Sequence, residues 1–236
     1  MGQIRAIFFD LDNTLWDVHP VIVRAEHAQY EFLRTRYPKV TALHDLDSMR
    51  DLRLQIACAS PAMRHDFTWL RLEALRRHAH EAGYPPTMAE EAFEVFFRAR
   101  NEVVLYDDVR PALDRLIRDY RLFAISNGNA DLAVIGLAQY FEAGLAAREA
   151  GMLKPDPRIF EILLARAGLH AHEAAHVGDD PEADVEGARR AGLLPVWLNR
   201  EGMAWPLETA APTVEIASLA DLPGAVGAAA QDRARM

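Results

Sequence analysis

The chain has 236 residues, of which half are hydrophobic and 26% are charged, the balance of an ordinary globular protein. Its formal net charge of -9 argues against nucleic-acid binding, which needs a concentrated basic surface. No apolar stretch approaches the roughly 20 residues of a membrane helix, and the first apolar run, Ile4–Phe9, ends at once in Asp10, unlike a signal peptide. We therefore expect a cytoplasmic protein, a monomer or small homo-oligomer, with no nucleic-acid or membrane partner.

The single cysteine, Cys58, cannot form an internal disulfide. Because it lies in an apolar stretch, we expect a buried small side chain and not a nucleophile. His170, His172 and His176 are close in sequence, but no cysteine or carboxylate completes a zinc site at the usual spacing. Neither residue type therefore predicts a catalytic centre.

The first expected element is a strand at Ile4–Phe9, which is rich in Ile and Phe without alternation and so is predicted to be buried on both faces. It runs directly into Asp10, Leu11, Asp12, Asn13 and Thr14. Aspartates in such a position often only cap turns, so on their own they do not indicate chemistry.

The next region, residues 18–103, predicts about four helices and no strand. We expect helices at 20–36, from Asp47 or Ser48 to Cys58, at 66–82, and from a capping box at Thr87 to about Val104. Four consecutive helices are typical of an insert that folds as its own small bundle.

After Tyr106 strands and helices alternate, which predicts right-handed βαβ units and a parallel sheet. The expected strands are 121–125, 145–148, 174–177, 195–198 and 214–216. The expected helices are 111–120, 131–140, 157–167 and 181–191. The tail from Gly224 is predicted to be frayed.

Polar residues gather where three predicted strands end: Asp10 and Asp12, Ser126 and Asn127, and Asp179 and Asp180. Ligands of open α/β sheets bind outside these carboxyl ends. Carboxylates from two strands suit Mg²⁺, while a nearby lysine, a hydroxyl and an amide suit a phosphoryl group. The pattern therefore favours phosphoryl transfer.

Four segments together resemble the motifs of the haloacid dehalogenase superfamily: Phe9–Leu15, Ser126–Gly128, Lys154–Pro157, and Gly178–Asp180 followed by Asp184. The resemblance extends from Ile4 to about Ala220. It implies an α/β fold, with a Rossmann-like three-layer parallel-sheet core (residues 1–17 and 104–236) and an inserted all-helical cap domain (residues 18–103).

The resemblance also implies a role for each motif residue. Asp10 would be the nucleophile that forms an aspartyl-phosphate, and Asp12 the general acid and base. Mg²⁺ would be held by the carboxylates of Asp10 and Asp179 and by the backbone carbonyl of Asp12. The phosphoryl group would be bound by Ser126, Asn127 and Lys154. Asp184 would steady either Lys154 or a metal-bound water. Asp180 stands where Ser is commoner, and its role stays open between metal ligand and supporting residue.

The implied function is Mg²⁺-dependent hydrolysis of a small phosphorylated metabolite, with the cap reading the leaving group. Segments 17–31, 67–71, 126–130 and 176–184 are also similar to bacterial phosphatases of flavin mononucleotide and of a phosphorylated riboflavin precursor. Cap side chains suited to a flat, phosphorylated ligand are Arg24, Arg64, Tyr30 and Trp69. Alternatively, Trp69 and Tyr30 pack between cap helices.

Three other functions are compatible with parts of this pattern. A haloacid dehalogenase would need neither a metal nor an acid/base aspartate, so Asp12 and Asp179 argue against it. A phosphomutase shares the whole core. A non-catalytic phospholigand-binding protein would be signalled by loss of Asp10 or Asp12, and both are present.

Overall fold

The computed structural model describes residues 3–235, which form two compact units. The core unit comprises residues 3–17, Val104–Gly128 and 136–235, and the helical unit comprises Val18–Val103 and Asn129–Ile135. The sequence predicts that residues 129–135 belong to the core, but in the structure their contacts lie with the helical unit. No helix of the described residues is long and apolar enough to cross a membrane.

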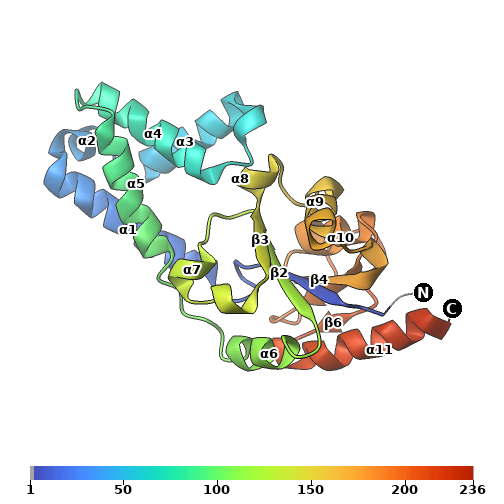
Figure 1. Ribbon diagram of the computed structural model, residues 1–236. Helices are drawn as coiled ribbons and strands as arrows, with labels where there is room; N and C mark the ends of the chain where they lie inside the picture. Colours follow the sequence, from blue (N-terminus) through green and yellow to red (C-terminus); the bar gives the residue numbers. More distant parts are fainter. Residues whose placement is uncertain (1–2, 236) are drawn as a thin grey trace. The chain divides into compact units, whose positions relative to one another are not determined.

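The core unit is built on a six-stranded sheet in the order β3-β2-β1-β4-β5-β6, and every neighbouring pair is parallel (Figure 1). The strands are β1 (Ala6–Phe9), β2 (Arg121–Ser126), β3 (Ala143–Ala146), β4 (Ala174–Gly178), β5 (Leu194–Leu198) and β6 (Glu215–Ile216). The order reverses direction between β1 and β4, and such a switch point is where doubly wound sheets bind ligands.

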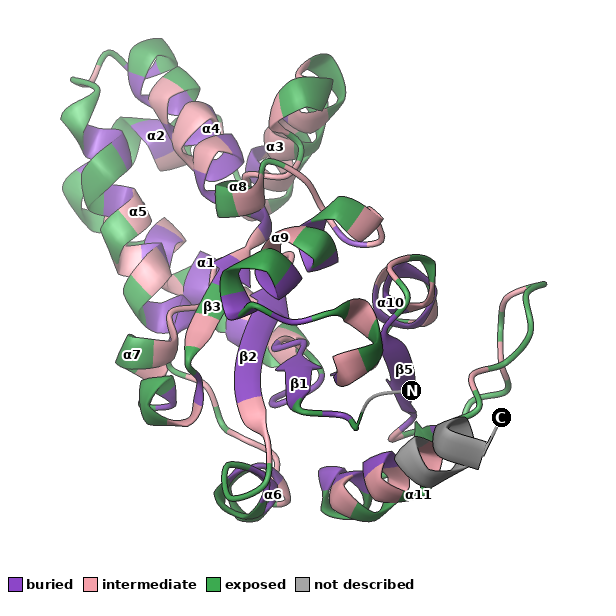
Figure 2. Cartoon of the chain, turned by 45° about the vertical axis from the view of Figure 1, so that its right-hand side comes forward, coloured by how far each residue is buried: buried purple, intermediate pink, exposed green. Residues whose placement is uncertain are grey.

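Helices cover both sides of this sheet, which confirms the α/β prediction. The helices of the core unit are α6 (Val109–Leu116), α8 (Ala147–Ala150), α9 (Pro157–Ala167), α10 (Gly187–Arg190) and α11 (Leu222–Arg235). Phe8 and Phe123 pack with Phe160 of α9 in one apolar cluster, and α6 contacts α11. The strands are buried accordingly, and Figure 2 shows β1 and β5 coloured as buried.

The strand register brings the motif residues to one edge of the sheet. Phe9 at the end of β1 lies opposite Ala124 of β2 and Val177 of β4. The residues that follow these three positions along the chain include Asp10, Ser126 and Asp179. Because the strands are parallel, these residues reach the carboxyl edge together.

The helical unit has an apolar core of its own. Its helices are α1 (Val18–Arg36), α2 (Pro38–Leu43), α3 (Leu46–Ala59), α4 (Phe67–Glu81), α5 (Thr87–Arg100) and α7 (Leu132–Ile135). Helix α1 packs along α5, and α4 packs against both α3 and α5. Leu33, Leu75 and Met88, from three different helices, meet in one buried cluster.

Several predicted helix ends were wrong, because capping depends on backbone conformation. Helix α3 begins after Asp45, whose side chain accepts from the Ser48 amide, and not at Asp47 or Ser48. Helix α5 follows Pro86 with no side-chain cap, so the capping box does not form. The predicted helix 131–140 is broken at Gly136, which has φ 77°.

Three other expectations were also wrong. Helix α2 was not predicted, and residues 224–235 of the tail belong to helix α11, while Met236 lies outside the described residues. Cys58 is exposed and not buried, because it lies on the outer side of α3, whose buried positions are Met49 and Ile56.

Candidate active site

A buried cation joins two carboxylates at the carboxyl edge of the sheet. The Lys154 ammonium donates to Asp10 Oδ1 at 2.5 Å and to Asp184 Oδ1 at 2.6 Å. All three side chains are less than 10% exposed. Lys154 comes from the segment before α9, Asp10 follows β1 and Asp184 follows β4, so the sheet edge assembles residues far apart in sequence.

The charges of this group do not balance. Burial raises the pKa of Asp10 well above its ordinary 3.8; Lys154 opposes this rise, and Asp184 and Asp179 add to it. Burial alone would lower the pKa of Lys154, but Asp10 and Asp184 outweigh it and raise the pKa. For Asp184, Lys154 and His176 outweigh burial and hold the pKa low. One ammonium thus faces several carboxylates.

Asp179 supplies the third carboxylate. Its oxygens lie within 4.8 Å of ligand atoms of Asp10 and Asp184. Burial and the charge of Asp184 raise the pKa of Asp179 to about 7, while Thr14 Oγ1 donates to Asp179 Oδ1 at 3.2 Å. Closely spaced carboxylate oxygens with excess negative charge fit a hard divalent cation. Asp10 and Asp179 are the residues here that could hold such an ion.

Both carboxylate oxygens of Asp184 already make hydrogen bonds within the protein. Its Oδ1 faces His176 Nε2 at 2.9 Å as well as Lys154, and its Oδ2 accepts from the Asp180 amide at 3.1 Å. Gly178 makes room for it, since a Cβ on that glycine would lie 2.2 Å from Asp184 Cγ. Asp184 therefore holds the ammonium of Lys154.

The Asn127 side chain hydrogen-bonds to the backbone of Lys154. Its Nδ2 donates to the Lys154 carbonyl at 3.1 Å, and its Oδ1 accepts from the Lys154 amide at 2.8 Å. Ser126 is buried, and its Oγ accepts from the Gly128 amide at 2.9 Å, so its hydroxyl proton is available to a ligand. Of the expected phosphate-binding residues, Asn127 thus holds the backbone of Lys154 with its side chain.

The loop after β1 holds Asp12 beside a buried indole. Trp16 Nε1 donates to Asp12 Oδ1 at 2.9 Å. The turn between them closes through Asn13, whose φ of 63° lies in the left-handed region that Asn tolerates. The Asp12 carboxyl is partly exposed, in contrast to the buried Asp10.

Asp180, whose role the sequence left open, is an N-cap. Its Oδ1 accepts from the backbone amides of Glu182 at 2.8 Å and Ala183 at 2.7 Å. These bonds start the wide turn Pro181–Glu186, in which Asp184 lies. Asp180 therefore contributes to the site by orienting the segment that carries Asp184.

Comparisons with known proteins agree with this geometry. Residues 4–192 match the family model of haloacid dehalogenase-like hydrolases. The chain belongs to this family. It is 31% identical to the 5-amino-6-(5-phospho-D-ribitylamino)uracil phosphatase YigB of Escherichia coli, covering 94% of this chain and 96% of the relative.

Two further likenesses point to different reactions. The hydrolase is 37% identical to the phosphoserine phosphatase of Thermus thermophilus over 64% of this chain and 63% of the relative. A solved structure from Pseudomonas syringae, described as a 2-haloacid dehalogenase, is 37% identical with a TM-score of 0.91, covering 96% of this chain and 99% of the other.

Arg200 is a site neighbour of the hydrolase that the sequence did not reveal. Its guanidinium makes two bonds to Asp108, at 2.9 and 3.1 Å, and donates to the Thr14 carbonyl at 3.1 Å. It stacks over Tyr106 at 4.1 Å and lines a pocket that also contains Asp179. Arg200 thus ties the loop after β1 to α6, and no motif signals it because its partners lie 92 and 186 residues away.

The proposed cap residues lie in the helical unit. Arg24 is exposed and donates to the backbone carbonyls of Ala99 and Glu102. Trp69 is partly buried against the cluster of Ile56, Leu70 and Ala74. Tyr30 packs on the neighbouring cluster around Leu33, and Arg64 is exposed. Both aromatic rings therefore pack within the unit, which was the alternative reading.

Proposed function

We propose that this hydrolase is a Mg²⁺-dependent phosphatase of small phosphate monoesters, with Asp10 as its nucleophile. The observation that supports this most is the buried Asp10 carboxylate bonded to Lys154 at 2.5 Å, with oxygens of Asp179 and Asp184 within 4.8 Å. Phosphoryl transfer depends mainly on positioning and charge stabilisation, and this cluster supplies both.

The reaction would proceed in two steps carried by two aspartates. Asp10 attacks phosphorus and forms an aspartyl-phosphate, while the Asp12 carboxyl gives its proton to the departing alcohol oxygen. Asp12 then removes a proton from a water that attacks the same phosphorus, releasing inorganic phosphate and restoring Asp10. Lys154 and the Ser126 hydroxyl donate to the phosphoryl oxygens in both steps.

Mg²⁺ fits the acidic end of this cluster. Asp10 and Asp179 would hold it with the Asp12 carbonyl, because both oxygens of Asp184 are occupied by Lys154, His176 and the Asp180 amide. When bound, the ion supplies positive charge between the anionic substrate and the carboxylates. Burial first, and then the neighbouring carboxylates, raise the pKa values of Asp10 and Asp179, and such an ion would compensate the carboxylate charge.

For the substrate, we propose 5-amino-6-(5-phospho-D-ribitylamino)uracil, with flavin mononucleotide as a second ester. Support comes from the Escherichia coli phosphatase of that name, which is 31% identical over 94% of this chain. Both esters carry a flat ring system, and the exposed Arg24 is the proposed contact for them in the helical unit.

A 2-haloacid dehalogenase activity is the second candidate, because a 37% identical solved structure carries that description. Displacement of a halide from carbon requires no metal and no acid/base group two residues after the nucleophile. Asp12 and the Asp10–Asp179 pair would then have no task, so the phosphatase is favoured.

The test measures phosphate release from p-nitrophenyl phosphate, the two proposed esters and other monoesters, with Mg²⁺ and with EDTA. Wild type should release phosphate only with Mg²⁺, and Asp10→Asn should release none. Asp119→Asn, an exposed aspartate outside the cluster, is the matched control and should behave as wild type. Halide release from a 2-haloacid in EDTA, without phosphate release, would overturn the proposal in favour of the dehalogenase.

A further inference from the structure

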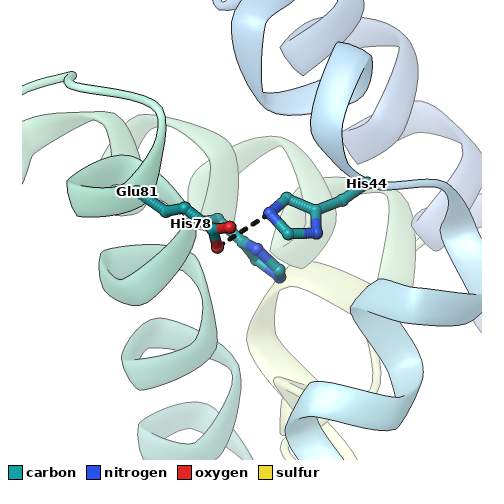
Figure 3. A group of neighbouring side chains, drawn as sticks. All are labelled: His44, His78 and Glu81. Atoms are coloured by element: carbon teal, nitrogen blue, oxygen red, sulfur yellow. Dashed lines mark hydrogen bonds and ion pairs between the residues drawn. The ribbon is translucent and has the colours of Figure 1, made fainter.

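The helical unit contains a second group of metal-ligating side chains, separate from the core site. His44 follows α2, while His78 and Glu81 lie in the last turn of α4. One ligand atom from each of the three lies within 4.8 Å of the others. Figure 3 shows the two imidazoles and the carboxylate converging from these two segments.

His78 is the member of the group that a purely structural role does not explain. Its side chain is buried, with 1% exposure, and neither ring nitrogen has a hydrogen-bond partner among the described residues. A buried polar group without a partner lowers the stability of the folded state. A bound cation would remove that cost by using one ring nitrogen.

The geometry around His78 suits such a cation. His44 Nε2 lies 3.1 Å from Glu81 Oε2, and adjacent ligands of a tetrahedral zinc ion are roughly 3.3 Å apart. The rings of His44 and His78 have centroids 4.3 Å apart. His78 and Glu81 are three residues apart on one helix, so their side chains project from the same face.

The protonation state of His78 and the solvent exposure of Glu81 are also compatible with metal binding. Burial, with smaller contributions from His44 and Arg53, lowers the pKa of His78 to about 4, so its ring is neutral at pH 7 and offers a lone pair. Arg53 shares the Glu26 carboxylate with Arg50 and Arg71, so this ion pair compensates its charge only in part. The Glu81 side chain is 59% exposed, which leaves the group open to solvent on one side.

We propose that His44, His78 and Glu81 bind a divalent transition-metal ion of the zinc type. Two imidazoles and one carboxylate suit Zn²⁺ and its neighbours, whereas Mg²⁺ and Ca²⁺ prefer oxygen ligands alone. The ion links the end of α2 to the end of α4 and stabilises the helical unit. All three proposed ligands belong to the helical unit.

The test uses Zn²⁺ itself, added to full-length protein stripped of metal and kept in excess Mg²⁺. Binding is followed by calorimetry and by the melting temperature, and Co²⁺ absorption reports the ligand set. Because zinc also competes for carboxylates elsewhere, the readout is the difference between wild type and variants. Wild type should bind one more equivalent than His44→Gln or Glu81→Gln, and only wild type should melt higher with zinc.

The size of the effect follows from the loss of a direct ligand. Mutation of a residue that only hydrogen-bonds to a metal ligand typically weakens metal binding by roughly 10–100-fold. His44→Gln and Glu81→Gln each remove a ligand itself, so each variant should bind zinc more than about 100-fold more weakly. His80→Gln is the matched control, an exposed histidine on the same helix. Equal stoichiometry and affinity in wild type, His44→Gln and Glu81→Gln would overturn the proposal.

A third variant separates metal binding from folding. His78→Leu removes the two unpartnered nitrogens and keeps the position apolar, so the metal-free variant should be at least as stable as metal-free wild type. It should also lose the zinc-dependent rise in melting temperature. A His78→Leu variant that still gains stability from zinc as wild type does would contradict the assignment of His78.

Discussion

At the scale of single residues, the site depends on a few positions that support the reacting groups. Asn127 and Asp184 hold Lys154 from its backbone and its ammonium, at 2.8 and 2.6 Å. Asp184 in turn is held by His176 and by the amide of Asp180. The segment around Asp10 is therefore only one part of the site, and Lys154 is held at both its backbone and its ammonium.

Gly178 gives the sharpest prediction at this scale. A methyl group there would lie 2.2 Å from the Asp184 carboxyl group, which Lys154 and His176 prevent from moving aside. Gly178→Ala should therefore displace Lys154 and lower kcat about 100-fold, the usual effect of a misplacement near 1 Å. Gly224→Ala, where a methyl group meets nothing within 4 Å, should leave kcat unchanged. Steady-state kinetics on p-nitrophenyl phosphate measure both, and equal kcat values would refute the argument.

At the scale of elements, α1, α3 and α4 are joined by one buried carboxylate. Glu26 of α1 pairs with Arg50 and Arg53 of α3 and with Arg71 of α4. Burial alone would raise the pKa of Glu26, but Arg53, Arg50 and Arg71 outweigh it and hold the pKa below its ordinary 4.5. The helices thus share a charged contact as well as apolar clusters.

Glu26→Gln should destabilise the helical unit by about 3 kcal/mol at pH 7, because it leaves buried arginine charge uncompensated. Since the folded-state pKa of Glu26 is lowered, its stabilisation is complete above pH 4.5 and is lost as the pH falls through the lower folded value. Wild type and variant should therefore converge in acid. Urea unfolding followed by circular dichroism at several pH values measures this.

The exposed pair of Arg76 and Glu90 provides the control for that experiment. Glu90→Gln should change stability little at any pH, because solvent screens an exposed pair. A difference between wild type and Glu26→Gln that persists unchanged in acid would show that ionisation of Glu26 is not the cause.

At the scale of the whole molecule, the chain leaves the core unit twice. Besides the long insert after β1, the segment Asn129–Ile135 joins the helical unit directly after the loop of Ser126 and Asn127. Asn129 accepts from Arg100 Nε and donates to Thr68 Oγ1, each at 3.2 Å. Both partners are buried, so Asn129 supports α4 and α5 from a distant part of the sequence.

Asn129→Ala should therefore weaken the helical unit by about 1–3 kcal/mol, because it leaves buried polar groups without this partner. Amide hydrogen exchange should accelerate in α4 and α5 more than in the core strands. Gln139→Ala, at an exposed position of the core unit, should leave α4 and α5 as protected as in wild type. Unchanged protection of α4 and α5 in Asn129→Ala would mean that the segment contributes nothing to the helical unit.

The sequence by itself determined the parallel sheet, the helical insert and the residues Asp10, Asp12, Ser126, Lys154 and Asp179, because strand ends and motifs are local patterns. Only the tertiary structure decided that Asn127 binds the Lys154 backbone and that His44 meets His78 and Glu81. These contacts join segments whose separation along the chain says nothing about their distance in space. Such contacts form only when the elements pack together. The hydrogen bond from Arg200 to the Thr14 carbonyl, 186 residues away in the chain, is a further example.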